Sequence, residues 1–342
     1  MPFAPDLRGA FLFGEGNHGW YNEKTRRYQD DLWFYDANAN RWVCVYPGAH
    51  VDQLDLKVNA EGFEATKEGE PIPVATMVHA YEMLTYDTDL RRFMSMNASC
   101  NYWMGALAGR RKAWLGALDP DKSWGDMKRC AAASPWFFDT QAGRWGRRAT
   151  QGPEPQTSFG DILMYVPARR QVFFHNWNSG RNLSWYYDPA KNAWTQISSK
   201  GPGPPFGGDM LACYDSRRDR IYLGQGKLWV FDIKTETWID PRPKAPVENE
   251  AWSAHSATLT YDTVNDAVVL IQYRNPGKGV HVYDPAANTW AAAHGSTPKE
   301  WDESLNMNGF YDPVLNAHFV HAAVDNAPGG VWTYRYRAPR KR

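Results

Sequence analysis

The segment WYYDPAKNAW, residues 185–194, contains the pattern that decides the fold of this chain. An aromatic run ends in an aspartate, a turn rich in Pro, Asn and Lys follows, and a tryptophan stands six positions after the aspartate. Aromatic residues are enriched in strands, whereas Asp, Asn and Pro favour tight turns. The segment therefore predicts a β-hairpin whose second strand opens with Trp194.

The same spacing of aspartate and tryptophan recurs along the chain. The other copies are LWFYDANANRW (32–42), WFFDTQAGRW (136–145), LWVFDIKTETW (228–238) and VHVYDPAANTW (280–290), while VWTYRY (331–336) keeps the strand without the turn. A hairpin used repeatedly at a regular interval indicates a repeat architecture.

A second pattern precedes most copies, in which an apolar strand ends in Tyr-Asp, turns, and returns as another apolar strand. Its copies are MLTYDTDLRRFMSMN (83–97), ILMYVPARRQVFFHN (162–176), MLACYDSRRDRIYLGQ (210–225), TLTYDTVNDAVVLIQ (258–272) and NGFYDPVLNAHFVHA (308–322). Joined to the first pattern, each unit makes four antiparallel strands over roughly 45 to 55 residues, a length typical of propeller blades. Blades stacked around an axis bury both faces of each sheet, which a single hairpin does not.

These repeats resemble the Kelch repeat, and the likeness, which extends to galactose oxidase and other Kelch-like propellers, covers nearly the whole chain. The fold class expected is all-β: a Kelch-like β-propeller of six blades of four antiparallel strands in one domain, 1–342. The expected blades are 9–44, 78–148, 158–198, 207–243, 253–294 and 306–338. We expect the N-terminal segment to complete the last blade, because closing the ring in this way removes exposed strand edges.

Two insertions interrupt the repeat around the second blade, at 45–77 and 98–134. The first predicts a hairpin with a turn at Asn59 to Gly62. Loops of this length in a compact domain are more often functional than not. We therefore look for function beside them.

The paired glycines that end the second strand of Kelch repeats are degraded here, and each pair contains at least one polar residue. The pairs at that position are Gly14-Glu15, Met96-Asn97, His175-Asn176, Gly224-Gln225, Gln272-Tyr273 and His321-Ala322. Strand interiors are apolar, so these side chains mark strand ends, and their types suit a hydrogen-bonding pocket. The alternative interpretation is that they cap backbone groups or fill a wet central channel.

Aromatic and basic residues in the connections after these strands suit a sugar ligand, because pyranose rings stack on aromatic faces while Asn, Gln and Arg bind hydroxyls and carboxylates. The substrate-binding candidates are Glu15, Asn97, Asn176, Trp177, Arg181, Gln225, His255 and Gln272. An aromatic-rich surface of this kind is equally compatible with a peptide ligand.

The first functional hypothesis is an enzyme that acts on an acidic glycan, as a polysaccharide lyase by β-elimination. Arg274 or Arg181, with Asn97 or Asn176, would neutralise the uronate carboxylate. His175 or His321 would remove the C5 proton, and Tyr273 would protonate the leaving oxygen. A sugar epimerase would use the same proton abstraction. The alternative is a non-catalytic Kelch module that binds a protein or a glycan.

Composition limits the partners that we expect. Thirty-eight basic residues balance 38 acidic ones, which disfavours nucleic acid, and the chain has no apolar run of membrane-spanning length. A glycan or oligosaccharide is the expected partner, with a protein as the alternative. The cofactor is left unknown, a divalent cation that neutralises the carboxylate or supports the structure being one option.

The four cysteines bear on the compartment. Cys44 and Cys213 alternate with apolar strand residues and are expected to be buried thiols, whereas Cys100 and Cys130 bracket the second insertion. A disulfide between the latter two would fit an oxidising compartment, so a secreted or periplasmic location is slightly favoured over a cytoplasmic one.

Overall fold

The structure is a computed structural model that describes most of the repeats. It describes residues 1–13, 21–22, 24–28, 30–50, 57–61, 63–66, 68–73, 80–96, 133–157, 160–176, 183–205, 208–245, 247, 252–254, 256–273, 278–293, 297–298, 301, 304–324 and 330–337. These residues form strands and turns, and none of them belongs to an α-helix or to a helix that could cross a membrane.

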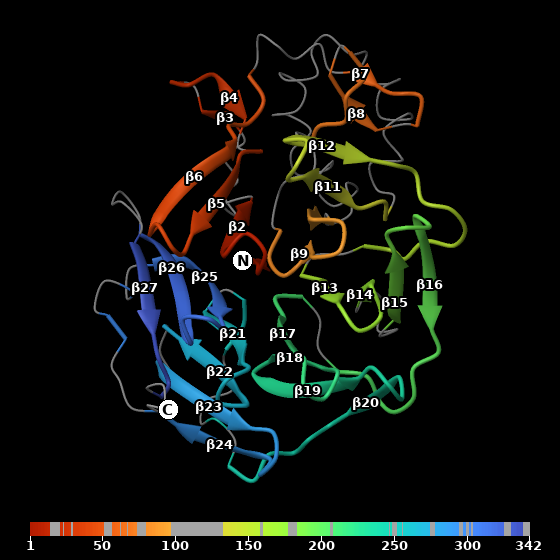
Figure 1. The fold of residues 1–342 in the computed structure, drawn as a ribbon. Coiled ribbons are helices and arrows are strands. Elements are labelled where there is room, and N and C mark those ends of the chain that lie inside the picture. Colours follow the sequence, from red (N-terminus) through yellow and green to blue (C-terminus); the bar gives the residue numbers. More distant parts are fainter. Residues whose placement is uncertain are drawn as a thin grey trace. The chain divides into compact units, whose positions relative to one another are not determined.

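Six antiparallel sheets form the blades of a β-propeller fold (Figure 1). The chain divides into two compact units, each of which contains three blades. One unit comprises Pro2 and residues 4–196, and the other comprises Met1, Phe3 and residues 197–342. The expected fold class is confirmed, with four strands in each of the first five blades and three described strands in the last. A single domain over 1–342 stays a prediction.

The strands of the first unit follow the repeats. Blade 1 contains β1 (Phe3–Ala4), β2 (Gly9–Phe13), β5 (Leu32–Asp36) and β6 (Arg41–Tyr46); blade 2 contains β9 (Leu84–Asp87), β10 (Arg92–Ser95), β11 (Trp136–Asp139) and β12 (Arg144–Arg147); blade 3 contains β13 (Ile162–Val166), β14 (Gln171–Asn176), β15 (Leu183–Asp188) and β16 (Ala193–Ile197). Two small hairpins accompany them, β3 (Tyr21–Asn22) with β4 (Arg27–Tyr28) and β7 (Lys57–Val58) with β8 (Glu64–Ala65).

The strands of the second unit do the same. Blade 4 contains β17 (Leu211–Asp215), β18 (Arg220–Gln225), β19 (Lys227–Asp232) and β20 (Thr237–Ile239); blade 5 contains β21 (Ala257–Asp262), β22 (Ala267–Gln272), β23 (Gly279–Asp284) and β24 (Thr289–Ala292); blade 6 contains β25 (Ser304–Asp312), β26 (Ala317–Val324) and β27 (Gly330–Tyr334).

The Tyr-Asp pattern of the sequence closes the hairpins through one repeated turn. At the β21–β22 turn, Asp262 Oδ1 accepts hydrogen bonds from the amides of Val264 (3.0 Å) and Asn265 (2.8 Å). The next residue, Asp266, has a left-handed φ of 56°, and the Tyr261 hydroxyl donates to its Oδ1 at 2.7 Å. The aspartate satisfies turn amides that no strand partner reaches, which is why it recurs. Equivalent aspartates are Asp36, Asp87, Asp139, Asp188, Asp215, Asp284 and Asp312.

The tryptophan of the pattern packs between blades. Trp145 belongs to the core between blades 1 and 2, Trp194 to the core between blades 2 and 3, and Trp290 to the core between blades 4 and 5. Within each unit the first strands of successive blades also lie together, as β9 does with β13 and β17 with β21. The blades therefore bury their faces against each other, as the repeat predicts.

Two local predictions have different outcomes. The hairpin expected in the first insertion is confirmed as β7 and β8, with Asn59 in its turn. The N-terminal strand β1 lies in blade 1 beside β2 rather than completing the last blade, because a short turn through Leu7 and Arg8 brings the two strands together locally.

The predictions for the cysteines have three different outcomes. Cys213 is buried between blades 4 and 5, as expected. Cys44 is exposed, which corrects the prediction of a buried thiol, because β6 is the outermost strand of its blade and faces no further strand in that sheet. Cys100 and Cys130 lie outside the described residues, so their disulfide stays a prediction.

Candidate functional site

Two of the predicted site residues, His175 and Asn176, end strand β14 in blade 3. His175 is fully buried, its Nδ1 lies 3.0 Å from Ser184 Oγ, and burial lowers its pKa to about 3. Asn176 is also buried, and its Nδ2 donates to Asp161 Oδ2 at 3.1 Å and to the carbonyl oxygen of Gln156. Both side chains make polar contacts with neighbouring strands and loops.

Four others lie in the second unit. Gln272 ends β22 and is buried, and Tyr273 packs in the core between blades 5 and 6 while its amide donates to Ser256 O at 3.0 Å. Gln225 ends β18 and is half-buried. His321 in β26 is also half-buried, and burial lowers its pKa to about 4.

The remaining predicted residues lie outside the described residues: Glu15, Asn97, Trp177, Arg181, His255 and Arg274. His175 and Asn176 belong to one compact unit, and Gln225, Gln272, Tyr273 and His321 belong to the other. The catalytic roles of His175, His321, Tyr273 and Arg274 stay predictions.

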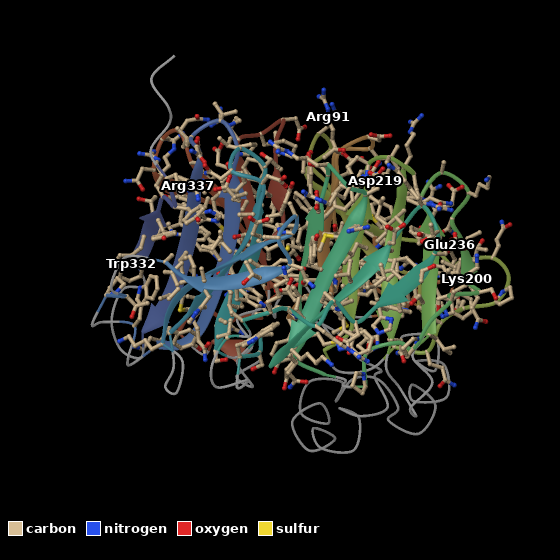
Figure 2. All side chains as sticks on the ribbon, turned by 90° about the horizontal axis from the view of Figure 1, so that it is seen from below. Arg91, Lys200, Asp219, Glu236, Trp332 and Arg337 are labelled. Atoms are coloured by element: carbon tan, nitrogen blue, oxygen red, sulfur yellow. The ribbon has the colours of Figure 1, made fainter. Side chains whose placement is uncertain are left out.

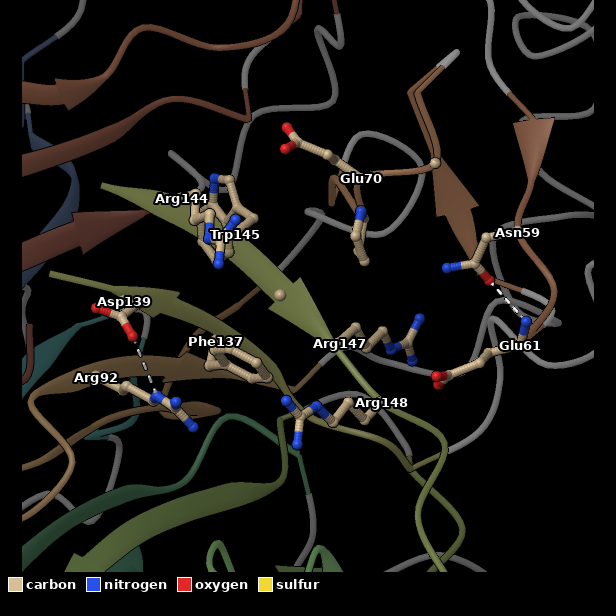
Figure 3. Close-up of a pocket in the computed structure, with 13 residues that line it drawn as sticks. Asn59, Glu61, Glu70, Arg92, Phe137, Asp139, Arg144, Trp145, Arg147 and Arg148 are labelled. Atoms are coloured by element: carbon tan, nitrogen blue, oxygen red, sulfur yellow. Dashed lines mark hydrogen bonds and ion pairs between the residues drawn. The ribbon is translucent and has the colours of Figure 1, made fainter. Parts of the chain in front are cut away.

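A pocket of about 360 Å³ lies beside the first insertion, one of the two places where the sequence predicts function (Figure 3). Its floor is the outer part of blade 2, and its wall is the loop that contains the hairpin of β7 and β8. The lining residues are Asn59, Glu61, Gly69, Glu70, Pro71, Arg92, Phe137, Asp139, Arg144, Trp145, Gly146, Arg147 and Arg148. Four arginines thus face three carboxylates.

Arg147 fastens the insertion to blade 2. Its side chain is buried, its Nε donates to Ser134 O at 2.8 Å, and its guanidinium lies 4.4 Å from the ring centre of Phe63 and 4.7 Å from that of Trp136. Stacking between two aromatic faces suits a planar guanidinium, which is weakly hydrated for a cation. A second contact, from the Ala149 amide to Glu61 Oε2 at 2.7 Å, ties the hairpin to the segment just after β12.

A stacked pair forms the opposite wall. Phe137 lies against Gly146 so closely that a β-carbon there would sit 2.3 Å from the ring, and the Arg92 guanidinium lies 4.5 Å from the ring centre. Arg92 Nε also lies 3.7 Å from Asp139 Oδ2, as the dashed line in Figure 3 marks. Gly146 is therefore required for the ring to lie where it does.

The four arginines and three carboxylates of the pocket leave an excess of one positive charge. Asp139 is already engaged by two turn amides and by Arg92, and Glu61 is engaged by the Ala149 amide. Arg144, the first residue of β12, and Arg148, just beyond its last residue, are exposed. Guanidinium groups bind carboxylate, sulfate or phosphate through paired hydrogen bonds, so this lining can hold an acidic group.

The predictions missed this pocket, although a signal was present. The run GRWGRR, residues 143–148, places three arginines on and just after a predicted outer strand. Alternation in a strand sends neighbouring side chains to opposite faces, so the pocket forms only because the insertion folds over the strand edge.

No group of three or more His, Cys, Asp or Glu side chains in the described ranges could hold a metal ion. The divalent cation left open by the sequence therefore has no support from these residues, and the cofactor stays unknown.

Comparisons with known proteins identify no family. No family model matches the chain, and no curated protein matches it. Among solved structures, the chain is similar to a structural genomics protein of unknown function from Bacteroides thetaiotaomicron, with 14% identity and a TM-score of 0.39. That match covers 55% of this chain and 46% of the other, so it spans about half of either protein. The propeller fold is shown, whereas membership of the Kelch family is not.

Proposed function

We propose that this protein binds an acidic glycan through the arginine-lined pocket of blade 2. The observation that carries the proposal is the group of four arginines, Arg92, Arg144, Arg147 and Arg148, in one cavity of about 360 Å³. Pockets for small ligands have volumes of roughly 300 to 1,000 Å³. The cavity is therefore large enough for one or two sugar units with a carboxylate or sulfate.

The four arginines have two different roles in binding. Arg147 and Arg92 are held by aromatic rings, so they are positioned before a ligand arrives. Arg144 and Arg148 are exposed and supply paired donors to an acidic group. Asn59 and Glu70 on the insertion wall provide groups that suit sugar hydroxyls.

Binding has more support than elimination chemistry. The described lining of the pocket contains no histidine and no tyrosine, the residue types expected to act as base and acid in a lyase. The predicted base His175 is buried in blade 3. The lyase and the epimerase therefore stay predictions from sequence, and the non-catalytic glycan-binding module is the function we favour.

Titration calorimetry with oligogalacturonates, their methyl esters and a sulfated chondroitin disaccharide tests the proposal. We expect an acidic oligosaccharide to bind at least about tenfold more tightly than the methyl ester, because only the free acid pairs with guanidinium. The double variant Arg144→Ala/Arg148→Ala should lose this preference, and Arg41→Ala, an exposed arginine on β6, should keep it. Equal affinity for acid and ester, or full binding by the double variant, would refute the proposal.

The same samples test the enzymatic alternative. Absorbance from an unsaturated uronate after incubation would show β-elimination. If that signal survived in the double variant while binding was lost, catalysis would reside at another site and the arginine pocket would be an accessory one.

A further inference from the structure

Exposed aliphatic side chains concentrate at one kind of turn. Among the described residues the exposed large hydrophobic ones are Leu7, Val43, Leu90, Val264, Val314 and Leu315. All but Val43 lie in the turn between the first and second strands of a blade. Scattered exposed hydrophobics need no explanation, but their occurrence in the same turn of four blades, 1, 2, 5 and 6, does.

The turns of blades 5 and 6 place three of these side chains together. Asn265 Nδ2 in the first turn donates to Asn316 Oδ1 in the second at 3.3 Å. Val264 next to that contact is 50% exposed, and in the second turn Val314 is 70% and Leu315 37% exposed. We call Val264, Val314 and Leu315 the aliphatic strip.

The two carboxylates that close these turns point inward, whereas the Asp266 side chain in the first turn is 26% exposed. Asp262 and Asp312 are fully buried, and each accepts hydrogen bonds from two amides of its own turn. The two turn-closing carboxylates are thus buried, the Asp266 carboxylate is paired with Arg217 and Arg218, and the aliphatic side chains stay exposed.

Arginines flank the strip on both sides. Arg217, with about half of its side chain exposed, donates through Nη2 to Thr263 O at 2.7 Å beside Val264, and its Nη1 lies 3.4 Å from Asp266 Oδ2. Arg335 donates through Nη2 to Leu315 O and through Nε to Asn316 O, both at 3.1 Å. The carbonyl of Arg337 accepts from Asn316 Nδ2 at 3.3 Å, and Figure 2 shows Arg337 above Trp332, which lies in the middle of β27.

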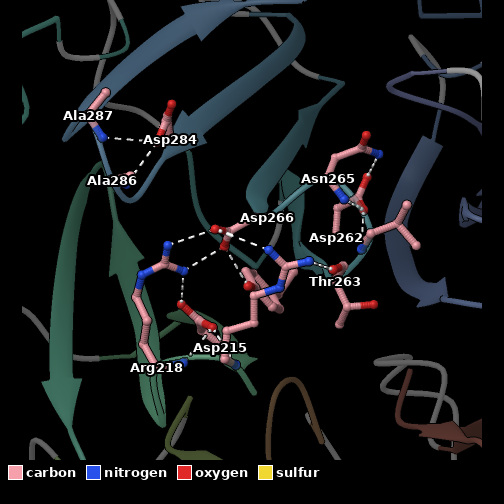
Figure 4. Close-up of polar contacts among 12 residues, drawn as sticks. Asp215, Arg218, Asp262, Thr263, Asn265, Asp266, Asp284, Ala286 and Ala287 are labelled. Carbon is pink, nitrogen blue, oxygen red and sulfur yellow. Dashed lines mark hydrogen bonds and ion pairs between the residues drawn. The ribbon is translucent and has the colours of Figure 1, made fainter. Parts of the chain in front are cut away.

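The turn that carries Val264 is also fastened to blade 4. Arg218 bridges the first turns of blades 4 and 5, with Nη1 2.9 Å from Asp215 Oδ2 and 2.6 Å from Asp266 Oδ1 (Figure 4). Its Nη2 donates to Asp266 Oδ2 at 2.8 Å. A surface held in place before binding loses little conformational freedom when a partner docks.

We propose that the aliphatic strip is a docking site for an acidic segment of another protein. The segment would place two aliphatic side chains on Val264 and Val314, with Asp or Glu residues on either side that face Arg217 and Arg335. We choose an acidic, aliphatic partner because the strip combines exposed apolar side chains with arginines on both sides. The site is separate from the arginine pocket, which lies in the other compact unit, and the proposal goes beyond glycan binding.

A protein fits these residues better than a membrane. Membrane-surface sites rely on Trp, Phe and Lys that reach into the headgroup region. The strip instead offers short branched side chains on tight turns, which suit an extended peptide.

A phage-displayed random peptide library, selected on the wild-type protein and depleted on Val314→Asp, tests the proposal. We expect enriched peptides with two aliphatic residues flanked by Asp or Glu. Synthetic copies should bind wild type at least about tenfold more tightly than Val314→Asp and weaken as salt is raised. Val43→Asp, the same change at an exposed valine on β6, should bind as wild type does, which also shows that an exposed aspartate does not unfold the blades.

Three results would overturn the proposal. They are the absence of any enriched peptide, enrichment of basic peptides, and equal affinity of the enriched peptides for Val314→Asp. Sedimentation of the protein with phosphatidylglycerol vesicles, abolished by Val314→Asp, would replace the proposed protein partner with an anionic membrane.

Discussion

Replacing Arg147 with alanine is expected to loosen the hairpin of β7 and β8 from blade 2. The buried guanidinium donates a hydrogen bond to Ser134 O and lies between the rings of Phe63 and Trp136. A hydrogen bond from a charged donor contributes about 2 kcal/mol, and each stacked face of a desolvated cation about 1 kcal/mol. The desolvation cost that disappears with the charge offsets part of this. We expect a net loss of about 3 kcal/mol in the free energy of hairpin opening.

Amide hydrogen exchange measures this opening directly. The Asn59 amide donates to Phe63 O and the Thr66 amide to Glu70 O, each at 2.8 Å, so both report on the insertion. A loss of about 3 kcal/mol accelerates their exchange about a hundredfold. The Glu61 contact with Ala149 remains, so the hairpin should open more often without being lost.

Two variants make the test sharp. Arg144→Ala removes an exposed arginine from the same strand and should leave exchange unchanged. Arg147→Lys keeps the charge without the planar group, so it should give an intermediate rate. If Arg147→Ala exchanged within about threefold of wild type at Asn59 and Thr66, the interpretation of Arg147 as the anchor would be wrong.

Three further changes test the packing and the buried charges. Arg218→Ala should lower the free energy of unfolding by about 2 kcal/mol in urea, because it leaves Asp215 fully buried without its cation, and an unchanged midpoint would contradict this. Burial acts to raise the pKa of Asp262, but hydrogen bonds from His318, Asn265 and the turn amide lower it to about 2. The stability that this carboxylate contributes should be present above about pH 4 and fade between about pH 4 and pH 2, so wild type and Asp262→Asn should converge in acid, and a difference independent of pH would refute it. Burial raises the pKa of Asp30 to about 7, so between about pH 4 and 7 the unfolded chain loses this proton while the folded protein keeps it. The wild type should therefore lose stability as pH rises across that range. Asp30→Asn should therefore gain stability relative to wild type over that range in thermal unfolding, whereas a constant difference would count against the assignment.

The repeated elements were predictable because their chemistry is local. An aspartate that binds its own turn amides, and a tryptophan that opens the next strand, act within one hairpin, so the pattern at 185–194 predicts the blade wherever it recurs. The insertion hairpin at Asn59 was predictable for the same reason.

The features that were missed depend on contacts between distant segments. The arginine pocket exists because residues near 60 and 70 fold over a strand at 144–147. The exposure of Cys44 depends on its strand being the outermost in blade 1, which alternation alone does not show. The burial of His175 likewise results from its neighbours, Ser184 among them, rather than from its place at a strand end.

The aspartate-closed turn also bears on how the chain acquires its structure. Each turn is completed by residues within a few positions of one another, so the hairpins are contacts of low sequence separation that form early and fast. The bridge from Arg218 to Asp266 spans 48 positions and forms only once the following blade exists. During synthesis the turn of blade 4 therefore forms first, and the bridge that joins it to blade 5 forms only after the turn of blade 5 has been made.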